Sequence, residues 1–268
     1  MKVIISHDID HFYWSDHFFK DLFVQKYILK NLIFFIKGEI SFSLLKARLK
    51  ALMSNRFGRL AELIHFNKLN DVPASYFVGV ENALNLSYSE DIAMSITSCL
   101  KDEGCPVYLH GIAYRESASM AKEKEKFQKI LKVKWQPGIR MHYLRSTAAT
   151  WNLLASLEYE FDSSLYELKN PFSVEQMIEF PVSMMEVYMI KYNEMNFEDV
   201  KERTIDRIQS AKERGLDYFT VIFHDHHFSE SFPLHKKWYE WLIDYFKGKN
   251  YEFVNFAQAI DETRKTPD

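Results

Sequence analysis

Short apolar runs alternate with longer amphipathic stretches over most of this chain. The first apolar run occupies residues 3–5, and six further runs have the length and composition of short buried strands, at residues 74–80, 107–110, 138–142, 178–183, 218–224 and 251–256. Between them the apolar spacing predicts helices, at residues 88–103, 117–132, 145–157, 197–214 and 234–247. Strands that alternate with helices in this way are typical of parallel β/α units. The pattern therefore predicts an α/β fold with a barrel-like sheet.

Residues 17–70 interrupt this alternation with a basic segment. Their apolar residues have mostly helical spacing, and they carry ten Lys or Arg against three Asp or Glu, a net charge of +7. One interpretation is a helical insertion packed on the main domain. Another is a basic amphipathic surface that contacts anionic membrane lipid or a partner. We predict a single domain spanning residues 1–268, with a basic helical insertion at about 17–70 that follows the first strand.

Composition excludes several classes of protein. The 268 residues are 47% hydrophobic, which is enough for a large core, and the formal net charge of −3 gives no indication of a nucleic-acid partner. No apolar run approaches the length that spans a membrane, and the N-terminal run is too short for a signal peptide. The two cysteines, Cys99 and Cys105, form neither a disulfide framework nor a metal-binding spacing. These features favour a cytoplasmic protein.

Polar side chains gather at the ends of the predicted strands. In a parallel barrel the carboxyl ends of the strands share one rim, so residues far apart in sequence should converge there. A single histidine at a strand end is more often structural than functional, but the whole set predicts a site. Its members are Asp8, Asp10, His110, Arg140, His142, His224 and Asp225.

These residues lie in segments that resemble a known family. The segments SHDID, ASYFV, LHGIAYRES, GIRMHYLR, FDSSL and VIFHDHHF follow the order and approximate spacing of the motifs of NodB-type polysaccharide deacetylases, carbohydrate esterase family 4. The resemblance covers most of residues 1–260 apart from the basic segment. It implies a distorted (β/α) barrel that holds one divalent cation, zinc in our prediction, and removes N- or O-acetyl groups from sugars.

The resemblance assigns roles to four of the polar residues. Asp8 corresponds to the catalytic base, and Asp10 corresponds to a metal ligand. Arg140 corresponds to the arginine that pairs with the base, and His110 corresponds to the first histidine of a His-x-x-x-His metal motif. The alternatives are that the two acids cap a turn and that Arg140 makes a structural salt bridge.

The second histidine of that metal motif is missing. Tyr114 stands in its place, and a neutral phenol is a poor ligand for a zinc-like ion. His142 ends the next predicted strand, so we predict that it replaces the missing ligand. Alternatively, only Asp10 and His110 hold a metal, or the chain binds none.

The remaining motifs supply an acid and its partner. His224 corresponds to the family's late histidine, which protonates the leaving amine. Asp162 corresponds to an aspartate that orients that histidine, although an aspartate before two serines is equally typical of a turn. The sequence HDHH also fits a separate metal cluster, with His224 and His226 on one face of a strand.

Three aromatic residues near the predicted rim, Trp14, Tyr143 and Phe228, are candidates for stacking against a sugar ring. Core packing is the competing explanation for each of them.

Two classes of function remain open. The first is a metal-dependent deacetylase that acts on an acetylated sugar or polysaccharide precursor, nucleotide-linked or lipid-linked, in surface polysaccharide assembly. The second is a non-catalytic relative that binds carbohydrate or acts as a scaffold. Retention of the acids, the arginine and two histidines together favours the enzyme. A barrel with a metal could also act on a small amide that is not a sugar.

Overall fold

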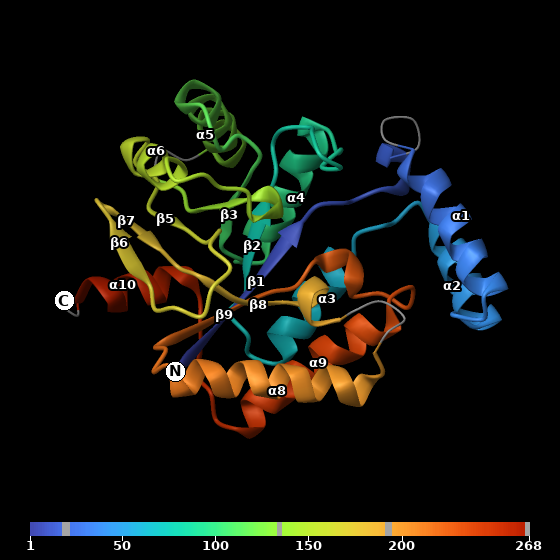
Figure 1. Cartoon of the computed structure of the whole chain (residues 1–268). Coiled ribbons are helices and arrows are strands. Elements are labelled where there is room, and N and C mark those ends of the chain that lie inside the picture. The colour runs from blue at the N-terminus through green and yellow to red at the C-terminus, as the bar shows by residue number, and fades with distance from the viewer. Residues whose placement is uncertain (18–21, 133–135, 191–194, 266–268) are drawn as a thin grey trace.

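A curled sheet of mostly parallel strands forms the centre of the molecule (Figure 1). The computed structural model describes residues 1–17, 22–132, 136–190 and 195–265. The strands are hydrogen-bonded in the order β6-β7-β5-β4-β3-β2-β1-β9-β8, and β10 pairs with the first part of β1. They are β1 (Lys2–Ile9), β2 (Ser75–Val78), β3 (Val107–Gly111), β4 (Ile139–Met141), β5 (Phe161–Asp162), β6 (Phe172–Val174), β7 (Met177–Glu179), β8 (Val182–Met185), β9 (Tyr218–Ile222) and β10 (Phe253–Val254).

The two ends of this sheet meet through one stretch of chain. β7 pairs with β5, whereas β8 pairs with β9, and only Phe180 and Pro181 separate β7 from β8. Proline has no backbone N–H, so it interrupts a ladder of hydrogen bonds at this point. A single bridge between Tyr166 and Val182 ties the chain after β5 to β8. The predicted distorted barrel is therefore confirmed.

Five of the helices occupy the predicted positions, whereas two helices and three short turns of the described residues were missed. α4 (Glu90–Asp102), α5 (Ser117–Leu131), α6 (Thr150–Ser156), α8 (Phe197–Glu213) and α9 (Pro233–Gly248) follow the apolar spacing of the sequence. The helices missed are α7 (Glu186–Met189) and α10 (Phe256–Lys265), together with the short turns η1 (Trp14–His17), η2 (His142–Leu144) and η3 (Asp225–His227). All are short or directly follow a strand, where periodicity is a weak signal.

Three helices lie between β1 and β2, which confirms the predicted helical insertion after the first strand. They are α1 (Phe23–Ile36), α2 (Phe42–Met53) and α3 (Leu60–Leu69); residues 18–21 of the predicted segment lie outside the described residues. α1 and α2 form a hairpin at one side of the barrel (Figure 1). Arg48 of α2 is buried and holds the hairpin together, because it donates to Asn31 of α1 and to the carbonyl of Ser231.

None of the helices in the described part of the chain is both long and apolar enough to cross a membrane.

Aromatic side chains fill the barrel below the rim. Ile4 of β1 packs in a cluster with residues from six other strands, and Phe256 of α10 belongs to the same cluster; the other members include Phe77, Tyr108, Phe161, Ile178, Tyr218 and Val254. Side chains alternate along a strand, so Ile4, Ser6 and Asp8 share the inner face of β1. Along the inner face of β1, the apolar cluster around Ile4 therefore gives way to the polar residues of the rim at Ser6 and Asp8.

Gly138 gives a test of this packing. A Cβ atom at Gly138 would lie 1.9 Å from the ring of Phe161, which is fully buried. We expect Gly138→Ala to lower the free energy of unfolding by about 2 kcal/mol or more, because an overpacked core must shift. Gly248→Ala is the control, since a Cβ there meets nothing within 4 Å and alanine is favourable in a helix. Equal urea midpoints for the two variants would contradict the packing described.

Candidate active site

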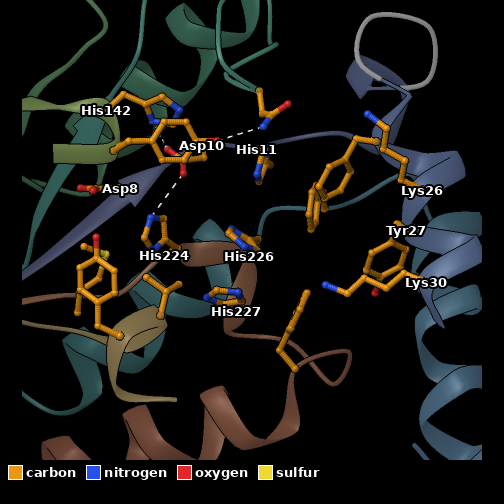
Figure 2. Close-up of a pocket in the computed structure, with 18 of the residues that line it drawn as sticks. Asp8, Asp10, His11, Lys26, Tyr27, Lys30, His142, His224, His226 and His227 are labelled. Carbon is orange, nitrogen blue, oxygen red and sulfur yellow. Dashed lines mark hydrogen bonds and ion pairs between the residues drawn. The ribbon is translucent and has the colours of Figure 1, made fainter. Parts of the chain in front are cut away.

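The carboxyl ends of β1, β3, β4 and β9 bring the polar rim residues to one pocket. Asp8 ends the inner face of β1 and Asp10 follows it, while His110 lies in β3, His142 directly follows β4, and His224 comes soon after β9. Figure 2 shows Asp8, Asp10, His142 and His224 on one side of the pocket. His110 also lines this pocket, which has a volume of about 690 Å³. The predicted convergence of distant strand ends is what the structure shows.

Asp8 forms a buried ion pair with Arg140. The Arg140 Nη1 atom lies 2.7 Å from Asp8 Oδ1, and Arg140 is fully buried. Its other N–H groups donate to the backbone oxygen and the hydroxyl of Ser163, at 2.9 and 3.0 Å, while its guanidinium lies 4.0 Å above the ring of Phe77. A buried guanidinium held from three sides fixes the carboxylate that it contacts.

Asp10, His110 and His142 form a group with the composition of a metal site. Asp10 Oδ1 lies 3.2 Å from His110 Nε2 and 3.5 Å from His142 Nδ1, and the two nitrogens are 2.9 Å apart. One ligand atom from each residue falls within 4.8 Å of the others, and all three residues are buried. His142 thus occupies the place predicted for it.

Hydrogen bonds on the far side of each imidazole fix which nitrogens face each other. His110 Nδ1 donates to the carbonyl of Arg140, and His142 Nε2 donates to the carbonyl of Leu84, because a carbonyl can only accept. In the neutral rings the two facing nitrogens therefore carry lone pairs, and Asp10 Oδ1 is an acceptor as well. This arrangement, with each outer N–H held by a carbonyl, is usual for histidines that ligate metal.

Three acceptors that face one another need a positive charge between them. A proton can supply part of it: burial lowers the pKa of His142, but the hydrogen bonds to Asp10 and Leu84 and the charges of Asp10 and Asp8 together outweigh burial and raise that pKa above the usual value. Burial likewise opposes ionisation of Asp10, yet its histidine partners hold its pKa well below the usual range. A divalent cation would satisfy all three groups at once. The residues therefore fit a metal of the predicted type.

Tyr114 lies in a separate set of contacts. Its hydroxyl accepts a hydrogen bond from Arg145 at 3.0 Å, and its ring lies beneath the guanidinium groups of Arg115 and Arg145. Tyr114, which stands at the position of the second histidine of the resembled motif, thus contacts two arginines and not the metal-type group.

Glu186, rather than Asp162, orients His224. Glu186 Oε1 lies 2.5 Å from His224 Nδ1 and 2.8 Å from His227 Nδ1, and Glu186 is fully buried. Burial lowers the pKa of His224, but the charge and hydrogen bond of Glu186 outweigh it and raise that pKa to about 10. His224 Nε2 lies 3.5 Å from Asp10 Oδ2, so the other edge of the ring is directed to the metal-type group.

Asp162 has a different set of neighbours. Its Oδ1 accepts a hydrogen bond from Ser164, and it pairs across the β5–β7 ladder with Glu179. This corrects the predicted role of Asp162 as the partner of His224. Glu186 could have been found from the sequence by the rule that located the other rim residues, because it directly follows β8. The predicted strand ends at residue 183, two residues before the end of β8.

The HDHH segment forms a turn instead of an extended strand. After His224 the chain enters η3, so His224 and His227 both reach Glu186, while His226 points to His11, with ring centroids 5.0 Å apart. The alternative cluster of His224 with His226 is therefore wrong. Glu186, His224 and His227 form a second group of possible ligand atoms within 4.8 Å of one another. Asp225 accepts the backbone N–H of Arg59 and thus holds the start of α3.

Of the three predicted sugar-contacting aromatics, Tyr143 lies at the pocket and the others lie in the core. Tyr143 is 57% exposed, lines the pocket and accepts a hydrogen bond from Asn85. Trp14 is buried and stacks on Phe57 with centroids 3.8 Å apart, and Phe228 is buried between Phe66 and Tyr239. Core packing thus explains Trp14 and Phe228, which corrects their predicted contact with substrate.

The α1 helix supplies a pocket wall that was not predicted. Lys26, Tyr27 and Lys30 face the histidines across the pocket (Figure 2). The sequence showed that this segment was basic and helical, but it gave no sign that one side of α1 would reach the rim of the barrel.

Comparison of whole structures identifies the fold. A structure described as a "putative polysaccharide deacetylase" from Mycobacterium smegmatis superposes with a TM-score of 0.66 over 99% of this chain and 91% of the other, at 15% sequence identity. The two chains share a fold. The resemblance seen in the sequence motifs is thus confirmed at the level of architecture. A GH57 branching enzyme from Thermococcus kodakaraensis also aligns, with a TM-score of 0.53, 10% identity, and coverage of 97% of this chain and 71% of that one.

Comparison of sequences gives no further assignment. No family model matches the chain, and no curated protein matches it significantly.

Zinc binding tests the metal-type group. We expect His142→Ala and Asp10→Asn to weaken zinc binding by more than the roughly 10- to 100-fold typical of an outer-shell change. Affinity should fall as the pH falls, because a proton competes for His142, whose pKa is raised. Calorimetric titration with zinc measures both effects. His226→Ala is the control, because His226 lies in the same pocket outside the group; equal losses in all three variants would contradict the assignment.

Proposed function

We propose that this protein is a metal-dependent hydrolase that removes acetyl groups from a sugar or polysaccharide precursor. The observation that carries the proposal is that three kinds of group lie next to one another in the pocket: a metal-type group, a candidate base and a candidate acid. The Asp10–His110–His142 group lies next to a carboxylate paired with an arginine and to a histidine paired with Glu186. Hydrolysis of an acetamide or ester needs a base, a charge that stabilises an oxyanion, and an acid, and each has a candidate here.

Asp10, His110 and His142 would hold the cation, zinc in our proposal, which would polarise the acyl carbonyl and acidify a water molecule. Asp8 would take the proton of the attacking water. The Asp8 carboxylate lies 2.7 Å from the buried guanidinium of Arg140. This ion pair holds the proposed base in a fixed position. Arg140 acts through Asp8 and is a positioning residue.

His224 would donate a proton to the departing nitrogen or oxygen. Glu186 engages Nδ1, which leaves Nε2 directed into the pocket near Asp10. A histidine held between two carboxylates carries protons on both nitrogens, so it can give one to the leaving group. Glu186 is therefore a positioning residue for the acid.

The pocket suits a sugar unit with part of its carrier. Its volume of about 690 Å³ lies in the range of small-molecule sites, and the exposed ring of Tyr143 offers a surface for a sugar face. The similar structure from Mycobacterium smegmatis is described as a "putative polysaccharide deacetylase", and we extend that substrate class to this chain. We further propose that the protein acts in the cytoplasm, on a precursor.

The first test concerns the base. We expect Asp8→Asn to lower kcat for acetate release from acetylated sugars by about 10²- to 10⁴-fold, while zinc binding is retained. Asp10→Asn should lose zinc binding and turnover together. Acetate release and zinc content are measured on the same samples. Equal zinc loss in both variants would reverse the assignment, and wild-type protein that binds sugar and zinc without releasing acetate would support a non-catalytic role.

The second test concerns the acid. A phenolate leaves without help, whereas a sugar amine needs a proton. We therefore expect His224→Ala to reduce hydrolysis of an N-acetyl sugar by about 10²-fold or more and hydrolysis of an aryl acetate much less. Equal losses on both substrates would show that His224 acts in another way.

The pH profile tests Glu186. His224 donates only when protonated, so activity should fall as the pH rises through its pKa. Glu186 raises that pKa, so Glu186→Gln should move the alkaline loss of activity to lower pH. An unchanged alkaline limb, with the His224 resonance unshifted in NMR titration, would contradict this role.

A further inference from the structure

The outer side of α1 exposes a row of large apolar side chains. Leu29, Ile33 and Ile36 are 60%, 41% and 82% exposed, and their i, i+4, i+7 spacing puts them in one row along the helix. Val24 and Asn31 are buried on the other side of α1. The helix therefore has an inner side that packs and an outer side that is apolar but uncovered in the structure.

The α2 helix repeats the arrangement. Phe42, Leu49 and Met53 are 67%, 36% and 88% exposed at i, i+7, i+11, while Leu45 and Arg48 are buried. In both helices the exposed row is separate from the buried residues. We call these two rows together the apolar face of the hairpin.

Lysines border this face. Lys37 lies beside the row on α1, and Lys46 and Lys50 lie beside the row on α2; all three are exposed, whereas Lys26 and Lys30 line the pocket. Residues 22–54 carry six Lys or Arg against one acid, a net charge of +5, so the rest of the chain has a net charge of −8. Positive charge is concentrated on the element that also exposes apolar side chains.

We propose that the α1–α2 hairpin, residues 22–54, docks this protein on an anionic lipid bilayer. Apolar side chains would enter the boundary between head groups and acyl chains, and the flanking lysines would contact lipid phosphates. A second copy of the chain is a poorer occupant, because two faces with the same positive charge would repel each other. The negative charge of the remaining chain would turn the barrel away from an anionic surface and leave the hairpin towards it.

The same helix connects the bilayer to the pocket. Phe23, Tyr27 and Lys30 of α1 line the pocket, whereas Leu29 and Ile36 lie on the docking face. A docked hairpin would hold the pocket beside the membrane surface. The proposal concerns the location of the protein and does not depend on hydrolysis.

Vesicle co-sedimentation of the full chain tests the proposal without substrate. We expect sedimentation with phosphatidylcholine vesicles that contain phosphatidylglycerol, and little with phosphatidylcholine alone. Binding should weaken as salt rises, because exposed charges are screened over about 10 Å at 0.1 M. No sedimentation with anionic vesicles at low salt, or equal sedimentation with both kinds, would overturn it.

Matched variants localise the contact. Ile36→Ser with Met53→Ser, and separately Lys37→Gln with Lys46→Gln, should each weaken binding by about tenfold or more. Met94→Ser and Lys122→Gln are the controls, because these residues are exposed on α4 and α5, away from the hairpin. All substitutions are at exposed positions, and urea unfolding checks that each variant is folded.

Two results would contradict the docking of the hairpin on lipid. Equal losses in the control variants would show that binding is not localised to the hairpin. A concentration-dependent dimer in light scattering that is lost in the Ile36→Ser, Met53→Ser variant, with no vesicle binding by the wild type, would assign the face to a second copy of the chain.

Discussion

A fully buried guanidinium inside the barrel constrains the whole site. Arg140 cannot lose its proton, so the strands around it must supply a carboxylate and enough acceptors to replace water. Asp8 of β1 and Ser163 after β5 meet this need, and Phe77 of β2 supplies the ring on which the guanidinium lies. One side chain thus ties together four strands and determines where the first acid of the site can be.

The ion pair of Arg140 with Asp8 fixes the end of β1, and the order of the strands then determines which side chains surround that end. With Asp8 fixed, Asp10 falls near His110 and His142, because β1, β2, β3 and β4 are neighbours in the sheet. On the other side of β1, β9 brings His224 towards the same carboxylate, and β8 brings Glu186 behind it. The proposed base, Asp8, therefore lies on β1, and the proposed acid, His224, comes from β9 on the side of β1 opposite to the metal-type group.

Much of this arrangement could be predicted from the sequence, and the exceptions have physical causes. Strand ends at Asp8, His110, Arg140 and His224 could be placed because buried parallel strands are short apolar runs followed by polar residues. Glu186 was missed because the predicted strand ends at residue 183, whereas β8 continues to Met185 and Glu186 directly follows it. Asp162 was given a partner by analogy, whereas contacts between side chains depend on tertiary packing.

The closure of the barrel has a consequence for the order in which the molecule folds. β1 holds Asp8 and is directly followed by Asp10, yet it pairs with β9, more than two hundred residues further along the chain. Contacts so distant in sequence form late, because a long loop must close before they stabilise anything. During synthesis one edge of β1 can pair with β2 early, whereas the edge that pairs with β9 must wait until nearly the whole chain has been made. Asp10, His110 and His142 all precede residue 143, whereas Glu186 and His224 belong to the last third of the polypeptide. A chain terminated before β8 would therefore contain the metal-type group but lack the proposed acid and its partner.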